Sequence, residues 1–420
     1  MNNEKPGYKF KKAHADHYLK VLIESEKFYR QGGNESSEGL AILGREMGQI
    51  ARAQDWCAQG AHNDIIRARL CSDFCNQAQH ILDCYMQPEE LKRWNWQGLK
   101  AARTLDDYFS YSEHISQLAN AALGQGKSYK AVRLLKTALE LIPLAQKPET
   151  EHLKSKAYIL CSLGVAYSEV NQPGEARKVL DNALKIGNEL SDDLAKQVAY
   201  INLAHIYHHD LDFQQAEFYL NKSLHLSEAT GDLSGQSVAL TSLANVFWDC
   251  YEEDSAMLEK AINYLEKALG FARKLGDSNL QSEIICSLSK CHWQMSNCEI
   301  AWDLGVEAIV IVNQLGNLRI RVDAQMNLAN IALDKRENDV AKALLEEVVS
   351  TGKHIRYDIT VVNGLYNLAL LADVNKQKEL ALEYISQALN ICNTHDSDCG
   401  FDEVKEEINK LIKKITESIE

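Results

Sequence analysis

The chain has 420 residues, of which 45% are apolar and 25% charged, with 5 prolines and 22 glycines. This length can bury a large core, and so few helix-breaking residues favour long helices. The net charge of −14 disfavours non-specific binding to nucleic acid or to anionic membranes. We therefore expect neither a nucleic-acid partner nor a membrane partner.

The sequence indicates a protein that stays inside the cell. No run approaches eighteen apolar residues, and the first residues, Met1 to Pro6, lead into no apolar segment of the kind that directs export. The cysteines are odd in number, 11, and are spread along the chain, which is not typical of a disulfide framework. We expect reduced thiols that serve as small apolar residues, and a soluble, cytoplasmic protein.

Residues 1–110 predict a helical bundle followed by a degenerate repeat. Apolar residues recur at helical spacing over three stretches, 10–30, 40–57 and 64–85. The next segment ends in Leu105-Asp106-Asp107, the counterpart of Leu275-Gly276-Asp277 further along, which indicates the second helix of a repeat. We expect Trp94 and Trp96 to join the bundle to the part that follows.

Residues 111–395 repeat themselves with a period of 40 or 45 residues. A small residue marks each unit: Ala119, Gly164, Ala204, Ala244, Ser289, Ala329 and Ala369. The alanine of the second helix follows twelve residues later in every unit except the fourth, where an insertion between Trp248 and Ala256 displaces it by five residues to Ala261. Small residues at both positions let two helices cross with their backbones close together. Seven helix pairs are predicted, and they must stack because no pair buries its apolar face alone.

Residues 396–420 predict a C-terminal capping helix. Val404, Ile408, Leu411 and Ile415 fall on one stripe of that helix, with charged residues on the other sides. A helix of this kind gives the last repeat a solvated outer face. A coiled-coil partner site is the alternative interpretation of the stripe.

The recurrence of small, aromatic and alanine positions over 111–393 resembles the tetratricopeptide repeat family. The spacing is similar to the forty-residue variety found in kinesin light chains and in scaffold proteins of cell polarity. The resemblance implies an all-α fold, a right-handed α-solenoid of about seven helix pairs, with the N-terminal bundle and the C-terminal capping helix at its ends. It also implies a concave groove, lined by the first helices of the pairs.

The front of the chain carries a second resemblance. His14-Ala15-Asp16-His17-Tyr18-Leu19 and the stretch from Leu43 to Trp56 are similar to the helical arm of STAND-type signalling ATPases, although Gln49 stands where an asparagine is usual. In that family the arm joins an ATPase core, which is absent from this sequence, to a repeat sensor. The layout also resembles bacterial peptide-sensing phosphatase regulators. Both resemblances imply a ligand sensor.

The sequence contains no complete motif for catalysis or for binding a cofactor. Gly124-Gln125-Gly126-Lys127-Ser128 lacks the first glycine of a phosphate loop, since Ala121 stands there and no strand precedes it. The cysteines and histidine between Cys286 and Cys298 are spaced so that one helix would scatter them instead of gathering them around zinc. No nucleophile has a neighbouring base. We therefore expect no enzyme, no cofactor and no metal site.

The candidate binding residues recur in register with the repeat. Asparagines stand directly before Leu-Ala in three units and directly after the small residue in three, at Asn202, Asn327 and Asn367, and at Asn120, Asn245 and Asn330. The resemblance places both positions in the concave groove. A side-chain amide offers a donor and an acceptor together, which matches the main chain of an extended peptide. The alternative is that these are solvated polar positions of no consequence.

Aromatic and charged side chains share this register. Trp248, Trp293 and Tyr366 are candidate apolar anchors, and Asp249, Glu283 and Asp323 are candidate sites for cations. His205 is a candidate partner contact, and Lys290 is nearly the only cation expected on the face. This acidic lining excludes the cationic clamp with which some tetratricopeptide repeats hold acidic chaperone tails.

The sequence therefore predicts a non-enzymatic protein-protein interaction scaffold. Its groove would bind a peptide or protein segment that carries basic and apolar residues. The alternative is a regulatory ligand sensor whose N-terminal bundle engages an effector. The sequence does not decide whether the protein forms a homo-oligomer.

Overall fold

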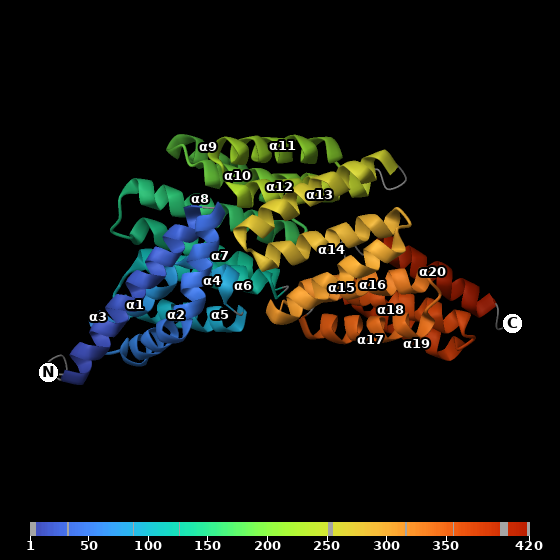
Figure 1. The fold of residues 1–420 in the computed structure, drawn as a ribbon, viewed down its shortest axis with the longest axis horizontal. Helices are drawn as coiled ribbons and strands as arrows, with labels where there is room; N and C mark the ends of the chain where they lie inside the picture. The colour runs from blue at the N-terminus through green and yellow to red at the C-terminus, as the bar shows by residue number, and fades with distance from the viewer. Residues whose placement is uncertain are drawn as a thin grey trace. The chain divides into compact units, whose positions relative to one another are not determined.

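The computed structural model of the protein describes residues 6–31, 33–86, 88–125, 127–250, 255–315, 317–355, 357–394 and 402–417. Within these ranges every regular element is a helix (Figure 1), which confirms the predicted all-α class. None of the described helices is long and apolar enough to cross a membrane. The helices divide into two compact units, Met1–Val246 with Gly270–Asp277, and Phe247–Leu269 with Ser278–Glu420.

The first unit begins with five helices that share one core. They are α1 (Pro6–Gln31), α2 (Gly33–Gly60), α3 (Ile65–Asn76), α4 (Gln79–Tyr85) and α5 (Pro88–Thr104). The stretch predicted as one helix over 64–85 is divided into α3 and α4, and the Asp64 side chain caps α3 by accepting from the backbone N–H of Ile66 and Arg67. Leu22, Leu43 and Phe74 are fully buried in this core.

The two tryptophans of α5 have different surroundings. Trp94 is fully buried and packs edge-on against Phe74, with ring centroids 6.4 Å apart. Trp96 is 46% exposed, so the prediction that it helps to join the bundle to the repeats is wrong. Residues two positions apart on an α-helix are separated by about 200° of rotation. Trp94 and Trp96 therefore cannot both face one core.

A buried histidine joins the bundle to the first repeat instead. His114 lies on α6 (Tyr108–Leu123), with Nε2 2.9 Å from Ser72 Oγ of α3 and Nδ1 3.2 Å from Asn95 Oδ1 of α5. Burial lowers the pKa of His114 to about 3. Gly98 of α5 lies under the ring, where an added Cβ would come within 2.4 Å of Cε1. Helices α3, α5 and α6 are thus held together by one satisfied polar cluster.

Seven helix pairs follow within the described residues. In chain order they are α6 with α7 (Ser128–Leu141), α8 (Glu149–Glu169) with α9 (Pro173–Leu190), α10 (Asp193–His209) with α11 (Phe213–Thr230), α12 (Leu233–Cys250) with α13 (Ser255–Leu275), α14 (Ser278–Gln294) with α15 (Cys298–Leu315), α16 (Leu318–Asp334) with α17 (Asn338–Ile355), and α18 (Asp358–Val374) with α19 (Lys378–Thr394). A short 3-10 helix, η1 (Ile142–Leu144), follows α7.

The predicted close approach within a pair is visible at the small residues. Ser289 Oγ of α14 donates to the backbone carbonyl of Ala301 on α15 at 2.7 Å. At Gly164 of α8, an added Cβ would lie 2.6 Å from Leu180 Cγ of α9. A larger residue at either position would push the two helices of its pair apart.

Left-handed residues separate the helices. Gly231 and Gly276 have φ of 70° and 69° and end the second helices of two pairs. Between the two helices of a pair the left-handed position is taken by larger residues, among them Leu211 with φ of 60°. Glycine is the residue that ordinarily marks a left-handed position in a sequence, so the sequence does not predict these non-glycine turns.

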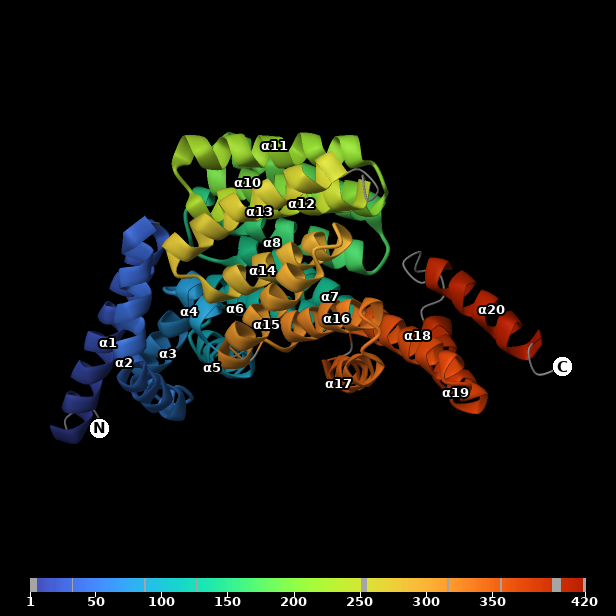
Figure 2. The same ribbon diagram turned by 45° about the vertical axis from the view of Figure 1, so that its right-hand side comes forward.

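The second unit ends in α20 (Asp402–Glu417), which lies beside α18 and α19 (Figure 2). Ile408, Leu411 and Ile415 are buried against these helices, so the predicted apolar stripe covers the last repeat. Lys414 Nζ donates to Asp373 Oδ2 of α18 at 2.9 Å. The helix thus packs where the first helix of a further pair would lie.

Candidate functional site

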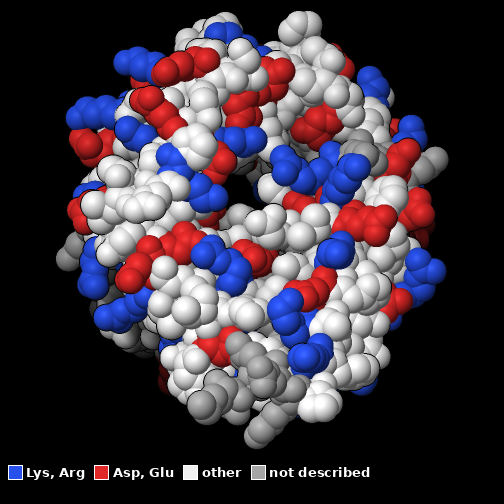
Figure 3. All heavy atoms as spheres, turned by 90° about the vertical axis from the view of Figure 1, so that its left-hand side faces the viewer, with Lys and Arg blue, Asp and Glu red and all other residues white. Residues whose placement is uncertain are grey.

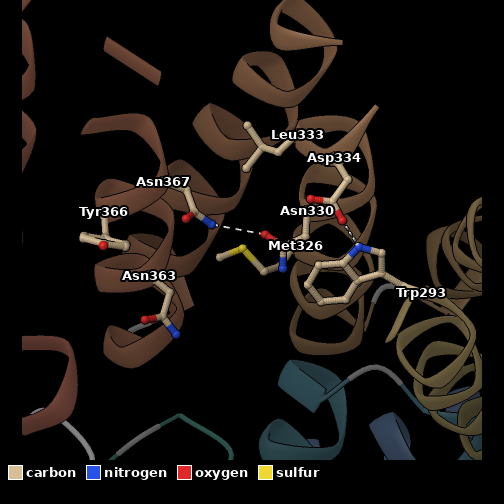
Figure 4. A pocket seen from close by; sticks show the side chains of 8 residues that line it. All are labelled: Trp293, Met326, Asn330, Leu333, Asp334, Asn363, Tyr366 and Asn367. Carbon is tan, nitrogen blue, oxygen red and sulfur yellow. Dashed lines mark hydrogen bonds between the residues drawn. The ribbon is translucent and has the colours of Figure 1, made fainter. Parts of the chain in front are cut away.

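The first helices of three consecutive pairs in the second unit line a pocket of about 300 Å³ (Figure 4). Helix α14 contributes Trp293, and the other lining residues come from α16 and α18: Met326, Asn330, Leu333, Asp334, Asn363, Tyr366 and Asn367. The repeat explains why they meet, since equivalent residues of neighbouring first helices lie side by side when the pairs stack.

Two asparagine amides meet in the middle of this pocket. Asn367 Nδ2 donates to Asn330 Oδ1 at 3.1 Å, and both side chains are half-buried (Figure 4). This bond orients both amides and leaves the N–H groups of Asn330 and the carbonyl oxygen of Asn367 for another molecule. Asn363, one turn before Asn367 on α18, adds a third amide to the lining. The pocket therefore offers both donors and acceptors.

One end of the pocket combines an indole with a carboxylate. Trp293 Nε1 donates to Asp334 Oδ2 at 2.6 Å, which links α14 to α16. The second carboxylate oxygen of Asp334 points toward the pocket (Figure 4). Leu333 supplies apolar surface beside it. A negative charge next to apolar and aromatic surface suits a side chain with an apolar stem and a positive end.

The other end is formed by Tyr366. Burial raises the pKa of its hydroxyl, and the charged groups that act on it, Glu407, Lys410 and Lys414, belong to α20. Figure 4 shows Tyr366 and Trp293 on opposite sides of the pocket, with Met326 between them. The two ends therefore differ in chemistry.

Two predicted groove asparagines have roles within the fold. Asn202 Nδ2 donates to the Cys161 carbonyl oxygen at 3.3 Å, and Asn327 Nδ2 donates to the Cys286 carbonyl oxygen at 3.0 Å. In each case the bond joins the first helices of neighbouring pairs, and Asn327 is 9% exposed. The asparagine that precedes Leu-Ala thus helps to hold neighbouring pairs together, which the sequence analysis did not anticipate.

Trp248 is covered by a lysine of the same chain. Lys290 Nζ lies 3.3 Å from the centroid of the Trp248 ring. Burial lowers the pKa of Lys290, and the charge of Asp249 opposes this effect. The lysine occupies a face of the ring in this conformation, and the role of Trp248 as an apolar anchor stays a prediction. Lys290 was predicted as a cation on this face, not as the cover of an aromatic ring.

The predicted cation sites Asp323 and Glu283 lie apart from the pocket lining. Burial raises the pKa of Asp323 to about 6, opposed by the charge of Arg319 and by a hydrogen bond from Tyr357. The Arg319 guanidinium lies 4.6 Å from the centroid of the Tyr357 ring. Asp323 therefore already has a cation, Arg319, on its own helix. The side chains of Glu283 and Asp249 are exposed.

The remaining predicted residues belong to the first unit. His205 Nε2 of α10 lies 3.1 Å from Ser242 Oγ of α12, so it links two first helices. Asn120 of α6 and Asn245 of α12 are exposed. Their proposed contact with a partner stays a prediction.

The described surface shows no centre for a metal. Among the residues that the structure covers, no three His, Cys, Asp or Glu side chains are grouped to hold an ion. On the face shown in Figure 3, basic and acidic side chains are interspersed. Charge on this face is therefore mixed, although the chain as a whole carries −14.

Comparison with known proteins identifies the repeat. The family model described as "Tetratricopeptide repeat" matches residues 198–230, which are α10 and α11. Helices α10 and α11 are therefore a tetratricopeptide repeat, and the other helix pairs share its fold. No curated protein sequence matches the chain.

Several solved structures resemble the whole tetratricopeptide array. The Rap conjugation gene regulator of the plasmid pLS20, in complex with a Phr peptide, is 15% identical with a TM-score of 0.54 and covers 94% of this chain and 96% of its own. A Rap protein complexed with Competence and Sporulation Factor is 13% identical, with a TM-score of 0.54 and coverage of 83% and 99%.

A third resemblance is to a signal transduction ATPase with numerous domains, a STAND protein with a tetratricopeptide repeat sensor from Pyrococcus horikoshii. It is 16% identical with a TM-score of 0.52 and covers 87% of this chain. The chain spans 55% of that protein's length. At these identities the three structures show a common fold.

Four lining residues of the pocket were missed: Met326, Leu333, Asp334 and Asn363. The tetratricopeptide register could have found all four. Leu333 stands four residues after the small residue of its repeat, as Trp293 does, and Asn363 stands six before that of its own repeat, as Asp323 does. Asp334 stands five residues after the small residue of its repeat, as Asp249 does, and Met326 stands three before it, as Tyr366 does. Met326 and Leu333 were passed over because apolar residues on a repeat helix are ordinarily core.

Proposed function

We propose that the protein is a non-enzymatic scaffold that holds a peptide, or an extended segment of another protein, on the first helices of its repeats. The observation that carries this proposal is the pair of hydrogen-bonded amides, Asn330 and Asn367, at the centre of the pocket. Their free donor and acceptor groups match the carbonyl and N–H of a peptide main chain. The lining also favours basic and apolar side chains in the bound segment.

Two of the similar structures support this proposal. Both are named as complexes, one with a Phr peptide and the other with Competence and Sporulation Factor. They share with this chain an array of stacked helix pairs of nearly the same extent. The pocket residues are amides, aromatic and aliphatic side chains and one carboxylate, which suits binding better than catalysis. A cytoplasmic location remains part of the proposal.

The test removes the two central amides together. Asn330→Ala with Asn367→Ala deletes both partners of one hydrogen bond, so that neither is left unsatisfied and the fold is spared. We expect the double variant to lose the partner that wild-type protein captures from its native host, while its helical signal and melting temperature stay the same. Capture of the same partner in equal amount would refute the proposal.

The matched control is Asn313→Ala. Asn313 is an exposed asparagine on α15, the second helix of a pair in the same unit, and it is not part of the pocket. The control should capture the partner as wild-type protein does. Asn327 is unsuitable for this test because it is buried and bonded to the Cys286 carbonyl, so its loss would disturb the fold.

A regulatory sensor is the second candidate function. It is favoured by the likeness to the Rap conjugation gene regulator, which covers 94% of this chain and therefore includes most of the N-terminal bundle. In a sensor of this kind, a ligand bound on the repeats changes how the bundle helices α1 to α5 engage an effector. Solution scattering with and without a bound peptide separates the two candidates, since a pure scaffold keeps its radius of gyration and a sensor changes it.

A further inference from the structure

We infer that the pocket selects two side chains of the bound segment, a lysine or arginine at its Trp293–Asp334 end and an apolar residue at its Tyr366–Met326 end. This inference rests on the proposed function and specifies the partner: an extended segment in which a basic and an apolar residue lie an even number of positions apart, two or four. The sequence predicts both residue types but not where either one binds.

The basic residue belongs at the Trp293–Asp334 end. The indole N–H holds one oxygen of Asp334 at 2.6 Å and so fixes the carboxylate, while the other oxygen points toward the pocket (Figure 4). A cationic group there would pair with the carboxylate beside the indole ring, and its aliphatic stem would lie along Leu333. Asp334 is exposed, so the ion pair is screened by solvent and the aromatic and apolar contacts must share the selection.

The apolar residue belongs at the Tyr366–Met326 end. A half-buried phenol ring and a flexible thioether side chain make an adaptable apolar surface. The charges near Tyr366 are paired with one another, Lys410 with Glu407 at 2.8 Å and Lys414 with Asp373 at 2.9 Å. This end therefore offers a second cation no net attraction, and the two ends are not interchangeable.

The spacing follows from the central amides. If Asn330 and Asn367 hold an extended main chain, successive side chains of the segment point to opposite sides, and only alternate ones reach the pocket. The residues that enter the two ends are therefore an even number of positions apart, i and i+2 or i and i+4. The chain direction decides which of the two comes first.

The probe is a library of N-acetylated, C-amidated heptapeptides, screened against the full-length protein. We expect enrichment of Lys or Arg two or four positions from Leu, Ile, Met or Phe. In the best peptide, replacing Lys by norleucine, or Arg by citrulline, should weaken binding by about fivefold to thirtyfold, because an exposed ion pair and a cation–aromatic contact are lost together. Enriched peptides without this pair of residues would overturn the inference.

A double-mutant cycle then tests the basic end directly. Asp334→Asn keeps an acceptor for the Trp293 N–H but removes the charge. It should weaken the basic peptide about twofold to fivefold and leave the neutral analogue unchanged. Asp339→Asn, at an exposed acid on α17 outside the pocket, is the matched control and should change neither. Equal weakening of both peptides by Asp334→Asn would refute a charge-selective end.

Different results would refute the side-chain selection and the scaffold function. If library peptides bind, lose binding in the Asn330→Ala/Asn367→Ala variant, and yet ignore both the basic residue and Asp334, the scaffold function stands and the side-chain selection is wrong. If no library peptide binds the folded protein, the proposed function fails and the inference falls with it.

Discussion

The buried histidine between bundle and repeats should make folding sensitive to acid. His114 is fully buried, and burial lowers its pKa to about 3, whereas an unfolded histidine titrates near about 6.5. Above the unfolded pKa both states are neutral and nothing changes. As the pH falls below the unfolded pKa, the unfolded state binds a proton that the folded state does not bind. The free energy of unfolding therefore decreases progressively until the folded pKa is reached.

The size of the effect follows from these two pKa values. Between pH 7 and pH 5 the unfolded histidine goes from about one-quarter protonated to nearly fully protonated, while His114 in the folded state stays neutral. The linkage relation then gives a loss of about 2 kcal/mol in the free energy of unfolding. Burial is complete, so no discount for solvent screening applies.

The assay is urea unfolding at pH 7 and pH 5, followed by the tryptophan emission of the chain, to which Trp94 in the bundle core contributes. His114→Gln can still hydrogen-bond to Ser72 and Asn95 but does not titrate. It should be less stable at pH 7, by about 1 to 3 kcal/mol, and lose about 2 kcal/mol less than wild type on going to pH 5.

Other titrating groups cancel in this comparison. Asp323, with its pKa raised to about 6, gains stability as the pH falls, but it does so equally in wild type and variant. His225→Gln, at an exposed histidine of α11, should keep the wild-type dependence. If His114→Gln shows the same loss between pH 7 and pH 5 as wild type, the buried-neutral assignment is wrong.

Three further substitutions test the fold. Gly98→Ala would place a Cβ 2.4 Å from the His114 ring and should cost about 1 to 3 kcal/mol, measured as a lower midpoint in urea; an unchanged midpoint would show that the ring can move aside. Leu211 is 73% exposed with φ of 60°, so Leu211→Asn should raise stability by about 0.5 to 1 kcal/mol, and a lower melting temperature would contradict this reading of the turn. Asn327→Ala removes the amide bonded to the Cys286 carbonyl and should cost about 1 to 3 kcal/mol, whereas Asn330→Ala should cost less; equal losses would show that burial does not separate their roles.

The periodic features of the fold could be predicted from the sequence. The small residues and the alanines that follow them indicated seven pairs, and the apolar stripe of residues 404–415 indicated a helix that covers the last pair. These predictions succeeded because a repeat shows the same packing constraint several times. The division of 64–85 into α3 and α4 could not be read this way, since the bundle is not periodic.

The binding residues were harder to predict because their roles depend on the neighbouring repeat. Trp248 and Trp293 hold the same register position, but Lys290 covers the first and Asp334 accepts a hydrogen bond from the second. Asn327 and Asn367 are likewise equivalent in sequence. One donates to a backbone carbonyl and the other to a side chain. Register identifies the face of the helix, whereas the partner across the interface decides which groups remain available.

The position of His114 has a practical consequence for anyone who wants to shorten the protein. Its two hydrogen-bond partners come from α3 and α5, and Leu99 of α5 shares a core with Ile115 and Leu118 of the first repeat. Trimming the chain near residue 110 would leave an imidazole and an apolar helix face bare to water. A soluble fragment that retains the repeats must therefore carry α3 and α5 with it.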